Sequence, residues 1–167
     1  YLLSGGKSFF DKAEIKDIIA YLRLLANEDD DPAYIRAATT PKRGIGAATL
    51  QVLGTYAGER HVSLFAAAFE EGFAQRVAPR QFEPLLEFGQ FINRMQERAG
   101  RESANLVLPD LLKAIDYETY LYDHEEERVA QTRWANVCEF ANWINKKGEL
   151  DGKTLIELTQ SIALINM

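Results

Sequence analysis

The chain has 167 residues, of which 47% are hydrophobic and 26% charged, and this length and composition suit one folded domain with its own core. A net charge of -6 excludes a protein that coats nucleic acid over its whole surface, and a single cysteine, Cys138, excludes an internal disulfide. No apolar run reaches the ~20 residues needed to cross a membrane. A single cysteine fits a reducing cytoplasm, where we expect the protein to be. Both ends look cut from a longer protein, which indicates an excised domain.

Helical periodicity runs through most of the chain. Residues 11–26 place apolar side chains at i, i+3, i+4 and i+7, the pattern of one buried helix face. Asp11 is the expected N-cap of this helix, with Glu14 as its capping-box partner. Further helices are predicted over residues 32–38, 47–60, 63–69, 81–98, 109–115, 125–147 and 154–165.

Several helix boundaries follow from residues that begin or break helices. Pro84 is tolerated only near the start of its helix, and Pro109 must begin or kink the next one. Residues 148–152 are expected to form a turn, after which Thr154 caps the last helix. No segment shows convincing two-residue alternation. The predicted fold is therefore all-α, a compact bundle of about eight helices in a single domain over residues 1–167.

The most informative stretch is residues 40–50, TPKRGIGAATL, which joins two of the predicted helices. Its two glycines around one apolar residue, at 44–46, allow a tight turn and a close approach to another molecule. The next helix begins at once, so its first free N–H groups point out of the turn and favour an anion. Lys42 and Arg43 add positive charge beside them.

This turn is interpreted as a clamp for the DNA backbone that reads no bases. Ile45 can anchor the turn in the core, and Thr49 can add a hydroxyl donor. The predicted contact residues are Arg36, Thr40, Lys42, Arg43, Gly44, Ile45, Gly46 and Thr49. The run resembles the helix–hairpin–helix pattern, in which a Gly-apolar-Gly turn grips phosphate. The alternative is a helix corner without a ligand, since such corners often contain glycine.

The remaining motifs do not favour an active site. Residues 5–8, GGKS, lack the earlier glycine and the preceding strand of a phosphate-binding loop. His61 and His124 are far apart, and the acidic runs lack the spacing of a calcium loop. Cys138 lies in an apolar helical stretch and is expected to be a buried, inert thiol. We therefore expect no catalytic residue, metal or cofactor in this chain.

Aromatic side chains offer a second route to nucleic acid, through stacking on bases. They mostly fall at core spacing in the predicted helices, which favours packing. Phe9 and Phe10, which lie beside Lys7 and Lys12, are the two for which stacking stays open.

Several blocks occur in an order that resembles one helicase family. They are residues 5–17 (GGKSFFDKAEIKD), 20–24 (AYLRL), 29–30 (DD), 40–50 (TPKRGIGAATL) and 115–122 (IDYETYLY). Together they look like the inserted 2B subdomain of the UvrD/Rep/PcrA group of superfamily 1 DNA helicases, with the last block more similar to the Rep branch. The resemblance covers essentially the whole chain and is strongest over residues 4–50.

The resemblance implies a parent enzyme that hydrolyses ATP and unwinds DNA 3′ to 5′ in replication or repair. ATP and Mg²⁺ would be bound by its other subdomains, so this chain alone should be inactive. The family's duplex-contacting turn maps onto Thr40, Lys42, Arg43, Gly44, Ile45, Gly46 and Thr49. Expected partners are duplex DNA, the other subdomains and a replication or repair protein, without a membrane.

An alternative function comes from another class. In Rep-like members the resemblance implies a mobile subdomain that restrains the helicase activity of the monomer. The chain would then be an autoinhibitory module that docks on other subdomains or on a replication partner, and its contact with DNA would be incidental.

Overall fold

The computed structural model describes residues 6–165 of the chain. Within that range the only regular secondary structure is helical, apart from one isolated bridge between Ser103 and Thr154, so the all-α prediction is confirmed. The elements are η1 (Gly6–Asp11), α1 (Ala13–Ala26), α2 (Asp31–Thr39), α3 (Ala47–Arg60), α4 (Leu64–Ala67), α5 (Glu71–Ala74), α6 (Pro79–Ala99), α7 (Ala104–Ala114), α8 (Tyr117–His124), α9 (Glu127–Asp151) and α10 (Leu155–Ile165).

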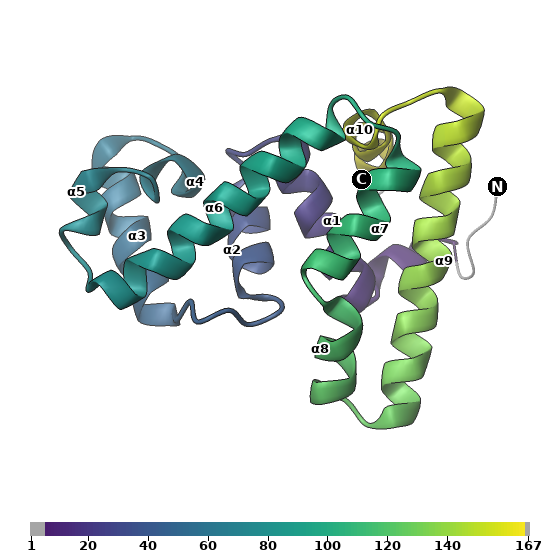
Figure 1. The fold of residues 1–167 in the computed structure, drawn as a ribbon, viewed down its shortest axis with the longest axis horizontal. Helices are drawn as coiled ribbons and strands as arrows, with labels where there is room; N and C mark the ends of the chain where they lie inside the picture. The colour runs from purple at the N-terminus through teal and green to yellow at the C-terminus, as the bar shows by residue number, and fades with distance from the viewer. Residues whose placement is uncertain (1–5, 166–167) are drawn as a thin grey trace.

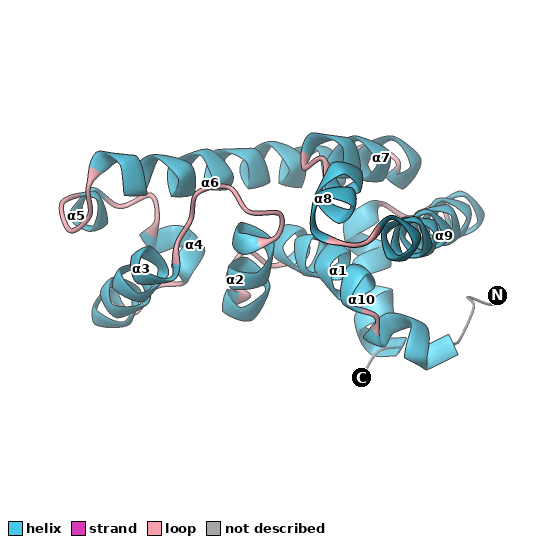
Figure 2. Ribbon diagram, turned by 90° about the horizontal axis from the view of Figure 1, so that it is seen from below, coloured by secondary structure: helices cyan, strands magenta, loops and turns pink. Residues whose placement is uncertain are grey.

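The long helix α6 joins two groups of helices (Figure 1). One group holds α3, α4 and α5, and the other holds α7, α8, α9 and α10 around α1. Seen from below, α6 and α7 form a layer over α3, α2 and α1 (Figure 2). The chain between α2 and α3, residues 40–46, runs along the edge below α6 in Figure 1.

The underside of α6 is apolar because its buried residues recur every three or four positions, at Leu85, Phe88, Ile92 and Met95. The Phe88 ring meets the rings of Tyr21 in α1 and Tyr34 in α2, with centroids 6.5 and 5.5 Å away. Burying one such ring contributes about 1.5–3 kcal/mol. This aromatic cluster fixes α6 over the end of α2, and thus over the turn that follows α2.

A second aromatic cluster packs η1 against α9. Phe9 and Phe10 in η1 are buried and pack against Phe140 and Trp143 in α9, with centroid distances from 6.2 to 6.5 Å. These two side chains are therefore core residues and are not exposed for base stacking. The packing interpretation made for most aromatics extends to them.

Two buried carboxylates in α1, near the start of the chain, accept hydrogen bonds from side chains in its second half. The Tyr117 hydroxyl in α8 donates to Asp17 at 2.7 Å, and the Asn136 amide in α9 donates to Glu14 at 2.8 Å. Asp17 and Glu14 are only 8% and 4% exposed. A buried carboxylate needs such donors because desolvation of the charge is otherwise unfavourable.

Three sequence-based boundaries were wrong. Lys12 occupies the N-cap of α1 without a side-chain hydrogen bond, because Asp11 belongs to η1 and Glu14 turns inward to Asn136. Helix α9 continues through Gly148 to Asp151, and it ends at Gly152, whose φ is 63°. Helix α7 begins five residues before Pro109, which lies inside it. The other predicted helices are present, and Ser63 and Thr154 accept hydrogen bonds from the first turns of α4 and α10.

Candidate nucleic-acid interface

The turn at residues 40–46 places its two glycines at the surface. Gly44 has a φ of 84°, a left-handed conformation that glycine adopts without a Cβ clash. Gly46 is extended and is the N-cap of α3, with no side chain capping the helix. Between them, Ile45 is half-buried and packs against the hydrophobic core. The predicted anchoring role of Ile45 is thereby confirmed.

The backbone amides of residues 44–49, at the end of the turn and the start of α3, form no hydrogen bond within the described part of the protein. The first bond of α3 runs from Leu50 N to Gly46 O, at 3.1 Å. The free amides therefore stand at the positive end of the α3 dipole, where an anion is stabilised. Exposure of Gly44, Gly46, Ala47 and Ala48 leaves this end open to solvent.

The polar side chains among the predicted contact residues differ in their accessibility. Lys42 is exposed. Thr49 is only 5% exposed, so its hydroxyl does not share the open surface of the amides. Arg36 is held by Asp17, which accepts from its Nε at 2.9 Å, and it also donates to Ala13 O at 3.2 Å. Its guanidinium is therefore paired with a carboxylate of the protein, although its side chain is 40% exposed.

The side chain of Arg43 packs against α1 and α6. Its guanidinium carbon lies 4.6 Å from the centroid of the Phe88 ring and 5.7 Å from that of Tyr21. One guanidinium nitrogen donates a short hydrogen bond to the Tyr21 hydroxyl. Within residues 6–165 no carboxylate forms an ion pair with Arg43. Two aromatic rings and one hydroxyl therefore hold its side chain.

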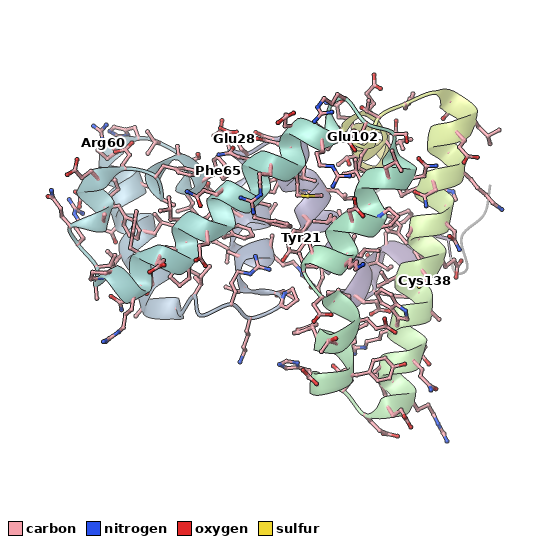
Figure 3. The ribbon with its side chains drawn as sticks, viewed as in Figure 1. Tyr21, Glu28, Arg60, Phe65, Glu102 and Cys138 are labelled. Atoms are coloured by element: carbon pink, nitrogen blue, oxygen red, sulfur yellow. The ribbon has the colours of Figure 1, made fainter. Side chains whose placement is uncertain are left out.

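Tyr21 lies near the middle of the molecule, where α1, α2 and α6 meet (Figure 3). Its hydroxyl is 2.9 Å from Ala37 O, at the end of α2, and 2.7 Å from Thr40 O, at the start of the turn. These carbonyls follow the last full turn of the helix, where the backbone leaves acceptors unsatisfied. Burial raises the pKa of Tyr21 to about 12, although Arg43 opposes the shift. The phenol therefore stays protonated at neutral pH.

The turn borders a hollow of about 280 Å³ that opens between it and α6. Pro84 forms part of this wall, with its Cγ 3.8 Å from the point where a Cβ on Gly44 would lie. Lys42 and Glu87 both line the hollow. A carboxylate near the only exposed cation of the turn limits its attraction for anions, so the positive potential comes largely from the amides and from Arg43.

Sequence reasoning found the turn but not the residues that hold it. Tyr21 is one of the aromatic residues whose helical spacing indicates core packing, and no sequence motif singles out Phe88. Their contact with Arg43 joins positions 22 and 45 residues apart, a separation at which no local pattern carries information. The sequence offers one signal for the partners of Arg43. This residue is basic, precedes a glycine turn and has no acidic neighbour in sequence.

The other candidate sites remain unsupported. Gly6 to Ser8 lie in the 3-10 helix η1, whereas Gly5, the first residue of the GGKS run, lies outside the described residues. Cys138 is half-buried rather than buried, and burial raises the pKa of its thiol, which favours the unreactive form. Across residues 6–165, every helix is too short or too polar to span a bilayer.

Comparison with known proteins gives a consistent result. The whole chain, residues 1–167, matches the profile of a family described as UvrD-like helicase C-terminal domain. It is 43% identical over 166 residues to the ATP-dependent DNA helicase Rep of Salmonella typhimurium, and 34% identical over 166 residues to the ATP-dependent DNA helicase PcrA of Bacillus subtilis. The DNA helicase II of Escherichia coli is 33% identical over 139 residues. These matches cover 97%, 99% and 83% of this chain but only 24%, 22% and 19% of the relatives.

Proposed function

The chain belongs to the UvrD-like helicase C-terminal domain family, and on this premise we propose that it is the 2B-type accessory subdomain of an ATP-dependent DNA helicase. In this proposal the parent enzyme unwinds DNA 3′ to 5′ and binds ATP and Mg²⁺ elsewhere, while this subdomain contacts the backbone of duplex DNA. The relatives are named as DNA helicases, and the chain corresponds to about a quarter of the length of the first two. The contact modulates unwinding and reads no base sequence.

The observation that carries the proposal is the row of unpartnered amides at the start of α3. Phosphate oxygens accept hydrogen bonds from main-chain N–H groups without any dependence on the base pair beside them. Gly44, Gly46, Ala47 and Ala48 expose their backbone, so a phosphate can approach closely. Lys42 supplies an exposed ammonium group next to them. Ile45 contributes by anchoring the turn in the core, whereas Thr49 is buried and is not part of the proposed contact surface.

The isolated chain should bind weakly. Each phosphate contact contributes about -0.9 to the slope of log K against log salt, and this small surface offers few contacts. The net charge of -6 also repels DNA over the rest of the surface. Binding is therefore best measured at low ionic strength, as fluorescence anisotropy of a labelled duplex titrated with the chain.

The sharpest test uses a methyl group as a probe of close approach. A Cβ at Gly46 meets nothing within 4 Å, and the extended φ of -93° suits alanine, so Gly46→Ala should fold normally. Its methyl group nevertheless stands at the N-cap of α3, on the residue whose own amide is one of the free donors. We expect roughly tenfold weaker duplex binding, as for one lost hydrogen bond to a charged group.

Gly54→Ala is the matched control. Gly54 lies in the same helix, is exposed and also has open space around a Cβ, so the substitution should leave DNA binding unchanged. Lys42→Ala should reduce the salt slope by about one. Duplex affinity that is equal for Gly46→Ala, Lys42→Ala and the unsubstituted chain would remove the proposed contact.

Exposed leucines favour docking on other subdomains as a second role. Leu106 and Leu150 are 55% and 86% exposed, at the start of α7 and the end of α9. A Cβ on Gly148 would lie 3.5 Å from Ala104 Cβ, so these two helix ends are adjacent. We propose that this end contacts the rest of the parent helicase. Leu150→Ser in the full helicase should change its unwinding rate, whereas an unchanged rate would argue against the contact.

A further inference from the structure

We infer that Arg43 and Tyr21 are positioning residues that hold the amide row in its DNA-binding conformation, and that Arg43 does not itself bind phosphate. This inference rests on the proposed function of the turn and specifies how the fold prepares it. The sequence alone assigned Arg43 to phosphate contact, but its guanidinium packs over Phe88 and donates to the Tyr21 hydroxyl.

One oxygen atom, in the Tyr21 hydroxyl, connects α1 with Thr40 and with Arg43. The Tyr21 hydroxyl accepts from Arg43 and lies 2.7 Å from Thr40 O, so it fixes both sides of Pro41 at once. Tyr21 is completely buried in α1, a helix that is itself fixed by its contacts with α2 and α6. The start of the turn is thus tied to the core through a side chain that cannot reach DNA.

The rest of the turn has few other restraints. Gly44 and Gly46 have no side chains, and the amides of residues 44–49 bond to nothing in the described protein. Ile45, half-buried, anchors the middle of the turn, and the bond from Leu50 N to Gly46 O holds its end. Loss of the Tyr21 hydroxyl should therefore spread the turn over several conformations, of which a fraction can bind phosphate. Apparent affinity falls by that fraction.

Arginine suits this role better than lysine. A planar guanidinium can stack on Phe88 and at the same time donate to a hydroxyl at its edge, which a lysine ammonium cannot reproduce. For a direct phosphate contact, in contrast, lysine would serve as a point charge. Arg43→Lys thus separates the two roles while the net charge of the chain stays constant.

The test is a double-mutant cycle of Tyr21→Phe and Arg43→Lys, measured by anisotropy with a labelled duplex across a salt series. We expect each single variant to bind about threefold to tenfold more weakly, with the salt slope of the unsubstituted chain, because charge and phosphate contacts are kept. The double variant should be no weaker than the weaker single variant, because both changes break one interaction.

Tyr34→Phe is the matched control. Tyr34 is equally buried and also packs on Phe88, but its hydroxyl has no partner in the described structure, so its removal should leave binding unchanged. Backbone ¹⁵N order parameters at Gly44 and Gly46 give a readout without DNA. They should fall in Tyr21→Phe and not in Tyr34→Phe.

Three outcomes would overturn the inference. They are full duplex affinity in Tyr21→Phe, full affinity in Arg43→Lys, and additive losses in the double variant. None of these affects the proposed contact itself, which stands or falls with Gly46→Ala and Lys42→Ala. Global destabilisation alone would lower the unfolding midpoint of Tyr21→Phe without changing the affinity of the folded chain.

Discussion

The hydrogen bond between Tyr117 and Asp17 should contribute measurably to stability, and Tyr117→Phe removes it cleanly. The hydroxyl donates to the carboxylate at 2.7 Å across 100 residues of sequence, and Tyr117 is completely buried. Phenylalanine keeps the ring, so the substitution leaves no cavity in the core. The substitution removes one hydrogen bond to a charged group. Such a bond contributes about 1.5–3 kcal/mol to the free energy of unfolding.

The structure narrows this range. Asp17 retains Arg36, whose nitrogens lie 2.8 and 2.9 Å from the same carboxylate, so the charge is not left without a partner. We therefore expect the lower part of the range, about 1.5–2 kcal/mol of the free energy of unfolding. For a domain of this size each kcal/mol lowers the melting temperature by about 2–4 °C.

Urea unfolding followed by far-ultraviolet circular dichroism measures this loss. The midpoint should fall while the m-value stays constant, because the same surface is exposed on unfolding. Tyr122→Phe is the control, since Tyr122 is 39% exposed and its hydroxyl has no hydrogen bond within the described residues. The reasoning would be refuted if Tyr117→Phe lowered the free energy of unfolding no more than Tyr122→Phe does. It would also be refuted if Tyr117→Phe caused the same loss of stability in a chain that carries Asp17→Asn.

Three further predictions concern caps, backbone and titration. Asp30→Ala should lower the free energy of unfolding by about 1–2 kcal/mol, because Asp30 is the N-cap of α2 and accepts from Ala33 N at 3.1 Å. The control Asp29→Ala should cause no measurable loss in the same urea assay. Gly44→Ala should cost roughly 1–2 kcal/mol, because its φ of 84° strains an L-residue, and a cost no larger than that of Gly46→Ala would contradict this. The contribution of Tyr21 to stability should be constant up to about pH 10 and fall as the pH rises further, because burial raises the pKa of Tyr21 to about 12 and the folded state holds that proton more tightly than the unfolded state. Urea midpoints at a series of alkaline pH values should decline less steeply in Tyr21→Phe.

Local rules predicted the helices well where one signal dominated. The amphipathic spacing of residues 11–26 and the proline at Pro32 correctly placed α1 and α2. The rules failed where tertiary contacts competed with them. Glu14 has the spacing of a capping box, but its carboxylate is bound by Asn136, 122 residues away. Gly148 resembles a helix stop, yet α9 continues because its neighbours pack against α7 and α10.

The candidate site shows the same division. The glycines, the free helix start and the anchoring of Ile45 are local features, and the sequence predicted them. The direction of a long side chain is not local. Arg36 and Arg43 both looked available for phosphate, but buried partners hold one through Asp17 and the other through Tyr21. The sequence shows how many cationic residues lie near the turn. Only the folded structure shows which of their side chains are free to contact DNA.

The carboxylates in α1 have a consequence for how the chain is made. Asp17 and Glu14 leave the ribosome about a hundred residues before the donors in α8 and α9 that complete their shells. During that interval Asp17 can pair only with Arg36 and Glu14 lacks Asn136, so burial of α1 is less favourable than in the complete chain. The last third of the polypeptide closes the fold, and a shortened version that ends before α8 should stay loose and prone to aggregation.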